Sequence, residues 1–159
     1  MRITPAALDD SLPIHNNIVR AAYNNPDMFR GFGSLSVRVH SASHLSDRTR
    51  ELVVLSVTGR IHATYEWRPH VQIAERLGIA RADIDALWNG DVEHFESQDQ
   101  ATVMFARAVD EATVDEELWE HARQYFSELE LLDLTMLAGF YGLAARLALT
   151  FDVEPDIPG

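Results

Sequence analysis

Apolar residues recur at spacings of three and four positions along almost the whole chain, and this spacing constrains the fold more than any other feature. Such a period places these residues on one face of an α-helix, whereas a half-buried strand would show alternation. No internal repeat and no linker rich in Pro, Gly or Ser interrupts the pattern over 159 residues. Since this length supplies one sizeable core, we expect a single all-α domain over residues 1–159.

Helix start and stop signals divide the chain into seven or eight expected helices. A first helix is expected over residues 13–23, and a second starts at Pro26, although Gly31 and Gly33 weaken it. Ser46 or Asp47 is expected to cap a third, very apolar helix that ends between residues 59 and 63. The fourth helix is expected to start at a Thr64 cap, with Pro69 near its first turn, and to stop at Gly78. A short fifth helix is expected around residues 84–88, with Gly90 as its stop.

The second half of the chain repeats the capping-box pattern, in which a Ser or Thr is followed three residues later by Glu or Gln. The pattern occurs at residues 97–100, 113–116 and 127–130 and predicts three helix starts. The last helix, over residues 129–151, is the most apolar, and Gly139 and Gly142 would let another helix approach closely. This pattern is compatible with subunit association and equally with an ordinary core helix.

Charge and hydropathy exclude several classes of partner. The chain carries 25 acidic and 13 basic residues, a formal net charge of −12, which disfavours nucleic acid. Its longest uncharged apolar run, between Asp133 and Arg146, is shorter than the roughly 20 residues that span a bilayer. The first residues do not combine a basic start with an apolar core, as a signal peptide would. We therefore expect a cytoplasmic protein with no membrane partner.

The sequence contains no cysteine. Disulfides, zinc–thiolate sites, iron–sulfur clusters and thiol nucleophiles are therefore excluded for these residues.

Residues 60–70 hold the densest group of chemically functional side chains. Glu66 and His70 stand four residues apart near the start of an expected helix, so both project from one face and can share a proton. Glu51 starts the most apolar helix of the first half, and a short antiparallel connection would bring it toward the same face. An acid in such a place requires a partner or a function. The alternative is a surface Glu–His pair that only supports the helix.

A second class of site is a metal centre. His40 and His44 have the spacing of two ligands on one helix face, and Glu51, Glu66 and His70 would complete a carboxylate-rich set. Against this alternative, no Glu-x-x-His pair is repeated on two helices.

Several segments resemble the carboxymuconolactone decarboxylase family, which also contains the AhpD-type alkylhydroperoxidases. The similarity is closest over about residues 45–110, the expected family core, and is carried by residues 50–55, 65–67, 70, 73–79 and 84–87. In the peroxidase branch a Glu is followed by a Cys-x-x-Cys pair and a His. Counted from Glu51, those places fall at Ala63, Glu66 and His70. Both sulfurs are absent, so the chain resembles the decarboxylase branch and thiol peroxidase activity is not expected.

The resemblance implies an AhpD-like helical bundle that assembles as a homo-trimer or homo-hexamer and acts as a carboxy-lyase on a small carboxylated lactone or keto acid, without a metal or organic cofactor. Glu51, Glu66 and His70 would be catalytic, with His70 as the proton donor. Glu66 would set the tautomer and charge of His70, and Glu51 would extend the relay. Arg60 or His62 would hold the substrate carboxylate, with a solvated helix end as the alternative. Tyr65 and Trp67 would line the site, or equally pack in the core or at a subunit interface. Another lyase, isomerase or hydrolase of the same fold, or a small-molecule-binding protein, remains the alternative.

Overall fold

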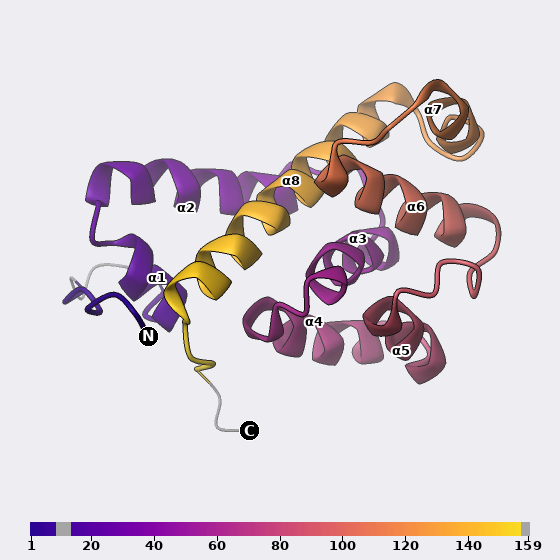
Figure 1. The fold of residues 1–159 in the computed structure, drawn as a ribbon. Helices are drawn as coiled ribbons and strands as arrows, with labels where there is room; N and C mark the ends of the chain where they lie inside the picture. The colour runs from indigo at the N-terminus through magenta and orange to yellow at the C-terminus, as the bar shows by residue number, and fades with distance from the viewer. Residues whose placement is uncertain (9–13, 157–159) are drawn as a thin grey trace.

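The computed structural model describes residues 1–8 and 14–156, and within these ranges the chain forms eight helices and no strand, which confirms the all-α prediction (Figure 1). The helices are α1 (Asn17–Ala22), α2 (Pro26–Ser41), α3 (Asp47–Arg60), α4 (Thr64–Arg76), α5 (Arg81–Asn89), α6 (Ser97–Glu111), α7 (Glu116–Ala122) and α8 (Glu128–Phe151).

Helix α3 is the centre of the fold, since it packs against α4, α5, α6 and α8. Every residue from Glu51 to Gly59 is buried, as its nearly continuous apolar sequence predicts. The two hydroxyls in this stretch are satisfied within the helix, because Ser56 and Thr58 donate to the carbonyl oxygens four residues earlier at 2.5 and 2.7 Å. A carboxylate placed on α3 is therefore surrounded by protein.

Helix α8 runs diagonally across the molecule, with α2 beside its middle and α6 and α7 beside its first half (Figure 1). Its core-facing side chains join those of α1, α2, α3 and α6 in one hydrophobic cluster. A second cluster lies between α3, α4, α5 and α6. The first residues of the chain pair with the end of α8, where the Arg2 backbone N–H donates to the Phe151 carbonyl at 2.6 Å.

Hydropathy alone marks α8 as long and apolar enough to cross a membrane, and it is the one such helix in the part of the chain that the structure describes. Half of its most apolar window is buried inside the fold. Its place in the core accounts for the buried half, while Leu132, Leu143 and other apolar side chains of α8 are exposed.

Several helix ends differ from those predicted. The first helix begins at Asn17 after an Asn16 cap, while Pro13 lies outside the described residues. Helix α2 continues through Gly31 and Gly33, because its Phe side chains pack on the core and outweigh the glycine cost. Thr64 is the first residue of α4 and does not cap it, which puts Pro69 in the interior of that helix.

Of the three predicted capping boxes, the one at Ser127 and Glu130 is confirmed, with both reciprocal hydrogen bonds present. The other two are wrong. Ser97 is itself the first residue of α6 and has a positive φ of 51°, so it is not in the extended conformation of a cap. Helix α7 is capped by Asp115, whose carboxylate accepts from the Leu118 N–H at 2.9 Å.

Candidate active site

The α3–α4 hairpin brings Glu51 and His70 into direct contact. Only residues 61–63 connect the two antiparallel helices, so the middle of α3 faces the middle of α4. The Glu51 carboxylate accepts a hydrogen bond from Nδ1 of His70 at 2.8 Å, and the two side chains are 8% and 10% exposed. A buried carboxylate in this position selects the tautomer and orientation of the imidazole.

Two further side chains extend this contact. The hydroxyl of Tyr141, on α8, lies 2.9 Å from Nε2 of His70 and 2.9 Å from Nε2 of His40, on α2. Glu51, His70, Tyr141 and His40 thus form a continuous hydrogen-bonded chain that joins four helices. Burial raises the pKa of Tyr141, so its hydroxyl stays protonated at neutral pH.

Glu66 lies near this chain but is not hydrogen-bonded to His70, since Glu51 and Tyr141 occupy both ring nitrogens. The expectation that Glu66 orients the imidazole therefore does not fit the structure. Glu51, 19 positions before His70 in the sequence, orients it instead. Burial raises the pKa of Glu66, the charge of His70 opposes this shift, and the charge of Asp156 adds to it. Glu66 is therefore biased toward its neutral, proton-donating form.

Glu66 and Tyr141 open into the same pocket, a space of about 430 Å³ between α1, α2, α8 and the start of α4. Aromatic and aliphatic side chains form most of its wall. Its lining includes Ile18, Val19, Phe29, Phe32, Val37, Phe140 and Ala144, with Asn16, Arg30, Ser34 and Ser36 as further polar groups. An apolar pocket with a few convergent polar groups is the usual form of a small-molecule site.

Tyr65 lines a smaller cavity of about 200 Å³ that Glu66 and Asp156 also line. Its hydroxyl donates to Asp156 at 2.5 Å and accepts from the Ile18 N–H at 3.1 Å. Burial is the main cause that raises its pKa. Tyr65 therefore ties the C-terminal segment to α1, and its hydroxyl is already engaged.

The other three predicted substrate-binding residues lie elsewhere. Arg60, at the end of α3, pairs with Asp110 at 2.5 Å and with Glu111 at 3.2 Å. The rings of His62 and Trp67 pack on Trp88 with centroid distances of 4.5 and 4.8 Å. None of the three lines the pocket of Glu66 and Tyr141. They are close to Glu66 in the sequence, but their side chains contact the α5 and α6 side of the fold.

The two histidines of the proposed metal site are also separated. Helix α2 ends at Ser41, so His44 does not continue the helical face of His40. His44 instead binds Asp133 on α8, through its backbone N–H at 2.7 Å and its ring at 2.9 Å. Within residues 1–8 and 14–156, no group of three His, Asp or Glu side chains is arranged to hold a metal ion.

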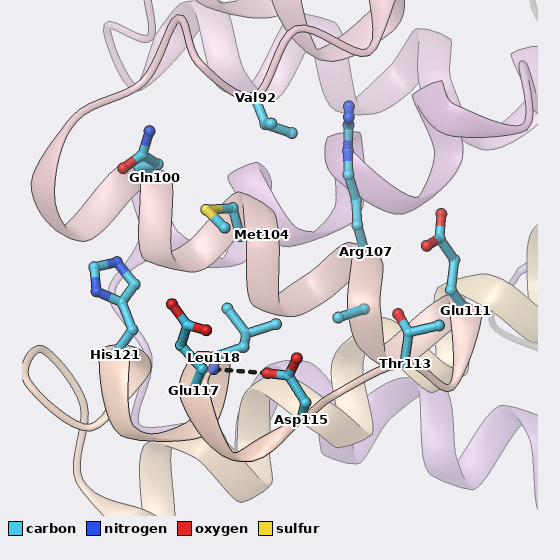
Figure 2. A pocket seen from close by; sticks show the side chains of 11 residues that line it. Val92, Gln100, Met104, Arg107, Glu111, Thr113, Asp115, Glu117, Leu118 and His121 are labelled. Atoms are coloured by element: carbon cyan, nitrogen blue, oxygen red, sulfur yellow. Dashed lines mark hydrogen bonds between the residues drawn. The ribbon is translucent and has the colours of Figure 1, made fainter.

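A larger pocket of about 590 Å³ lies between α6 and α7 (Figure 2). Of its polar side chains, Asp115 caps α7, and the Arg107 guanidinium donates to the carbonyl oxygens of Leu87 and Gly90 at 3.0 Å each. It contains none of Glu51, Glu66 and His70. The smaller pocket is therefore the better candidate for chemistry.

Sequence reasoning missed Tyr141 altogether and considered His40 only as a metal ligand. Tyr141 stands in a helix whose other core residues are apolar, so one phenol hydroxyl in that run was the available signal. Its partners, His40 on α2 and His70 on α4, are brought to it by tertiary packing, which the sequence pattern does not reveal.

Comparisons with known proteins agree with this fold. The model of the Carboxymuconolactone decarboxylase family matches residues 26–108, just over half of the chain. No curated protein matches. Several solved structures resemble this chain in fold at low sequence identity, and at such identity the similarity is evidence for the fold alone.

One similar structure is an uncharacterized peroxidase-related protein from Silicibacter sp. TM1040, with a TM-score of 0.77 and 20% identity over 92% of this chain and 80% of that chain. Another, from Agrobacterium tumefaciens, is a protein of unknown function described as a putative antioxidant defence protein AhpD, with a TM-score of 0.76 and 20% identity over 86% and 96%. A third is a debrominase in complex with 2,3,4-tribromopyrrole, with a TM-score of 0.74 and 20% identity over 91% and 79%.

Proposed function

Since this chain belongs to the carboxymuconolactone decarboxylase family, we propose that it is a cofactor-independent decarboxylase acting on a small carboxylated lactone or keto acid. The observation that carries the proposal is the place of Glu66. Where the peroxidase branch has its second cysteine, this chain has a carboxyl group that burial biases toward its acid form, at the wall of an apolar pocket.

The pocket presents the groups that such a reaction needs. Loss of CO2 from an unsaturated lactone acid or β-keto acid leaves an enolate-type anion, which must be stabilised and then protonated at carbon. Glu66 in its acid form would donate a hydrogen bond to the developing oxyanion. Tyr141 would deliver the proton to carbon, while His70 and Glu51 act behind it as positioning residues. His70 thus contributes to proton transfer through Tyr141, without touching the substrate.

The pocket also limits the substrate class. Its aromatic walls suit a flat, mostly apolar ring, and about 430 Å³ lies in the range of small-molecule sites. The Arg30 guanidinium lines this pocket in an exposed ion pair with Asp27, and it would exchange that partner for a substrate carboxylate. A structural neighbour whose ligand is a substituted pyrrole supports a small ring in this fold.

A second candidate is another proton-transfer reaction of the same site, such as a lyase without CO2 release, an isomerase or a ring-opening hydrolase. The pairing of an acid, Glu66, with the Glu51–His70–Tyr141 chain favours it, because the same groups can donate and accept a proton. A small-molecule-binding role without turnover is the alternative outside catalysis. Dithiol peroxidase chemistry is not proposed, since the sequence has no thiol.

The test is a screen of carboxylated lactones and cyclic β-keto acids, with CO2 release as the signal. Wild type is compared with Glu66→Ala, Tyr141→Phe and His70→Ala, and Glu120→Ala, which truncates an exposed glutamate on α7, is the matched control. Removal of an oxyanion donor costs about 10²–10³ in rate and loss of a proton-transfer group roughly 10²–10⁴, so the three site variants should fall by at least about 10² while the control keeps full activity. Equal turnover by all five proteins would reject the assigned site. Product formation without CO2 would favour the second candidate.

We also propose that copies of the chain associate through α8, as a homo-trimer or homo-hexamer in the cytoplasm. Leu129, Leu132, Met136 and Leu143 are 49%, 56%, 44% and 52% exposed, and their spacing places them on one face of the helix. Gly139 lies on the same stripe, where an added Cβ would meet no atom within 4 Å. A stripe of this size on one helix supports burial against another copy.

A further inference from the structure

His40 is the outer end of the hydrogen-bonded chain that reaches the pocket. It is half-buried near the end of α2, and its Nε2 is engaged by Tyr141. Among the described residues its other ring nitrogen has no hydrogen-bond partner. Glu51, the opposite end of the chain, is buried, and Tyr141 faces the substrate pocket, so His40 is the member through which the chain meets water outside that pocket.

We propose that His40 is the proton inlet of the site, which passes protons from solvent through Tyr141 to His70. The inference rests on the proposed function, because decarboxylation of a carboxylate consumes one proton per turnover: RCOO⁻ + H⁺ gives RH + CO2. Neither ring nitrogen of His70 is free to take that proton directly from water, since Glu51 and Tyr141 hold both.

The hydrogen-bond geometry defines the order of transfers. Glu51 keeps a proton on Nδ1 of His70, so Nε2 accepts from the Tyr141 hydroxyl, whose oxygen accepts from Nε2–H of His40. A proton from water adds to Nδ1 of His40. The Nε2 proton of His40 then moves to the Tyr141 oxygen as the Tyr141 hydroxyl proton moves to Nε2 of His70. His40 is again neutral, and His70 is an imidazolium beside Glu51.

Transfer of a proton from this imidazolium state to the substrate completes the cycle. The Tyr141 hydroxyl gives its proton to the carbanion carbon in the pocket, and its oxygen takes the Nε2 proton of His70. Tyr141 keeps one proton at each stage, in agreement with the pKa that burial raises. His40 regains its first tautomer by exchange with water. One solvent proton is taken up, and one C–H bond is formed.

The charges around His40 allow it to pass protons and not store them. It faces Tyr141 from α8, His70 from α4, and Glu51 and Arg50 from α3. Burial lowers the pKa of His40, and the charges of His70 and Arg50 lower it further against an opposing effect of Glu51. His40 is thereby kept mostly neutral at pH 7, as an inlet requires.

The decisive variant is His40→Gln, because a glutamine amide can still donate a hydrogen bond to Tyr141 but cannot relay a proton. His44→Gln is the matched control, four residues away and bonded to Asp133 outside the chain. Two measurements are made. The first is the solvent-exchange rate of the His70 ring N–H protons, followed by ¹⁵N-edited NMR on the whole protein, which needs no substrate. The second is steady-state turnover with and without added imidazole.

For His40→Gln we expect unchanged thermal stability, exchange at His70 slowed at least about tenfold, and turnover that falls at least about tenfold and recovers with imidazole, in line with the cost of a lost acid–base group. His44→Gln should match wild type. Exchange at the wild-type rate in His40→Gln would overturn the inlet. If wild type turns over no compound, the proposed function fails, while the exchange measurement still supports or rejects the inlet.

Discussion

Tyr141 and His70 are 71 residues apart in the sequence, yet the hydroxyl oxygen of the first lies 2.9 Å from Nε2 of the second, inside the protein. The two rings meet edge to face with their centroids 5.0 Å apart. The contact places a phenol between the buried histidine and the pocket, so His70 reaches a bound molecule only through Tyr141. This relationship changes which residue is expected to touch the substrate.

Replacing Tyr141 by Phe should reduce stability as well as activity. The variant keeps the ring but removes the hydroxyl, which leaves Nε2 of His70 unpaired in a buried site. An unsatisfied buried polar group costs about 1–3 kcal/mol, so the free energy of unfolding in urea should fall by that amount. Tyr125→Phe is the control, because Tyr125 is 37% exposed and lies on the surface near α7. Equal losses in the two variants would contradict a special role for the Tyr141 hydroxyl.

Glu66 should give the unfolding free energy a specific pH dependence. Its pKa is raised in the folded protein, mainly by burial, so the folded state holds the Glu66 proton more tightly than the unfolded state does. The stability that comes from neutral Glu66 is fully present below the unfolded-state pKa of about 4.3 and is lost as pH rises through the folded-state pKa.

The variant Glu66→Gln stays neutral at every pH and should lack this loss. The difference in unfolding free energy between variant and wild type is therefore expected to shift in favour of the variant as pH rises from about 4.3, then to become constant above the folded-state pKa. Urea titrations between pH 4 and 8 measure this difference, with Glu120→Gln as the surface control. Parallel curves for wild type and Glu66→Gln would show that burial does not perturb Glu66.

The sequence predicts the fold further than it predicts the site. Helix periodicity and the stops at Gly78 and Gly90 depend on local geometry, and both glycines have the expected positive φ of 79° and 84°. The Glu51–His70 contact also follows from local connectivity, since the short turn after Arg60 folds α4 back on α3. Tyr141 and His40 could not be placed in this way, because their contacts depend on how α8 and α2 pack against the hairpin. The contacts of Arg60, His62 and Trp67 with α5 and α6 could not be predicted either, because closeness along the chain does not determine the side of a helix.

Arg60 should therefore behave as a stabilising residue and not as a substrate ligand. It pairs with Asp110, whose side chain is 2% exposed and also binds Arg146. Burial opposes ionisation of Asp110, but hydrogen bonds from Arg146 and Arg60 outweigh it and lower its pKa. Arg60→Gln is expected to lower the unfolding free energy by about 1.5–3 kcal/mol, as loss of a hydrogen bond to a charged group does. It should leave the KM of any substrate unchanged.

The matched control for Arg60 is Arg123→Gln, which removes an exposed pair with Glu120. Surface pairs contribute about 0–1 kcal/mol, so this variant should remain near wild type. A raised KM in Arg60→Gln with unchanged stability would return Arg60 to the substrate site.

The exposed stripe of α8 should control assembly. Leu132→Glu puts a charge on a residue that is 56% exposed in the single chain, so the fold should be retained while association with other copies is disrupted. Light scattering coupled to size exclusion should show a mass shift from oligomer to a single chain of 17.9 kDa. Leu149→Glu, 44% exposed and about 100° away around the helix, should leave the mass unchanged. A monomeric wild type, or equal masses for wild type and Leu132→Glu, would reject assembly through this face.

Gly59 should tolerate no side chain, because α3, α4 and α5 meet at its Cα. A Cβ added there would lie 2.7 Å from the Trp67 ring and 3.0 Å from the Leu87 carbonyl oxygen, and the latter belongs to the backbone of α5. Gly31, inside α2, is the matched control, since a Cβ at that position would meet nothing within 4 Å. Gly31→Ala should stabilise the protein by roughly 0.5–1 kcal/mol through helix propensity. Gly59→Ala should destabilise it by about 1–3 kcal/mol, the usual cost of overpacking a core. Urea unfolding of the two variants measures both effects, and a Gly59→Ala variant as stable as Gly31→Ala would mean that α5 does not pack closely on α3.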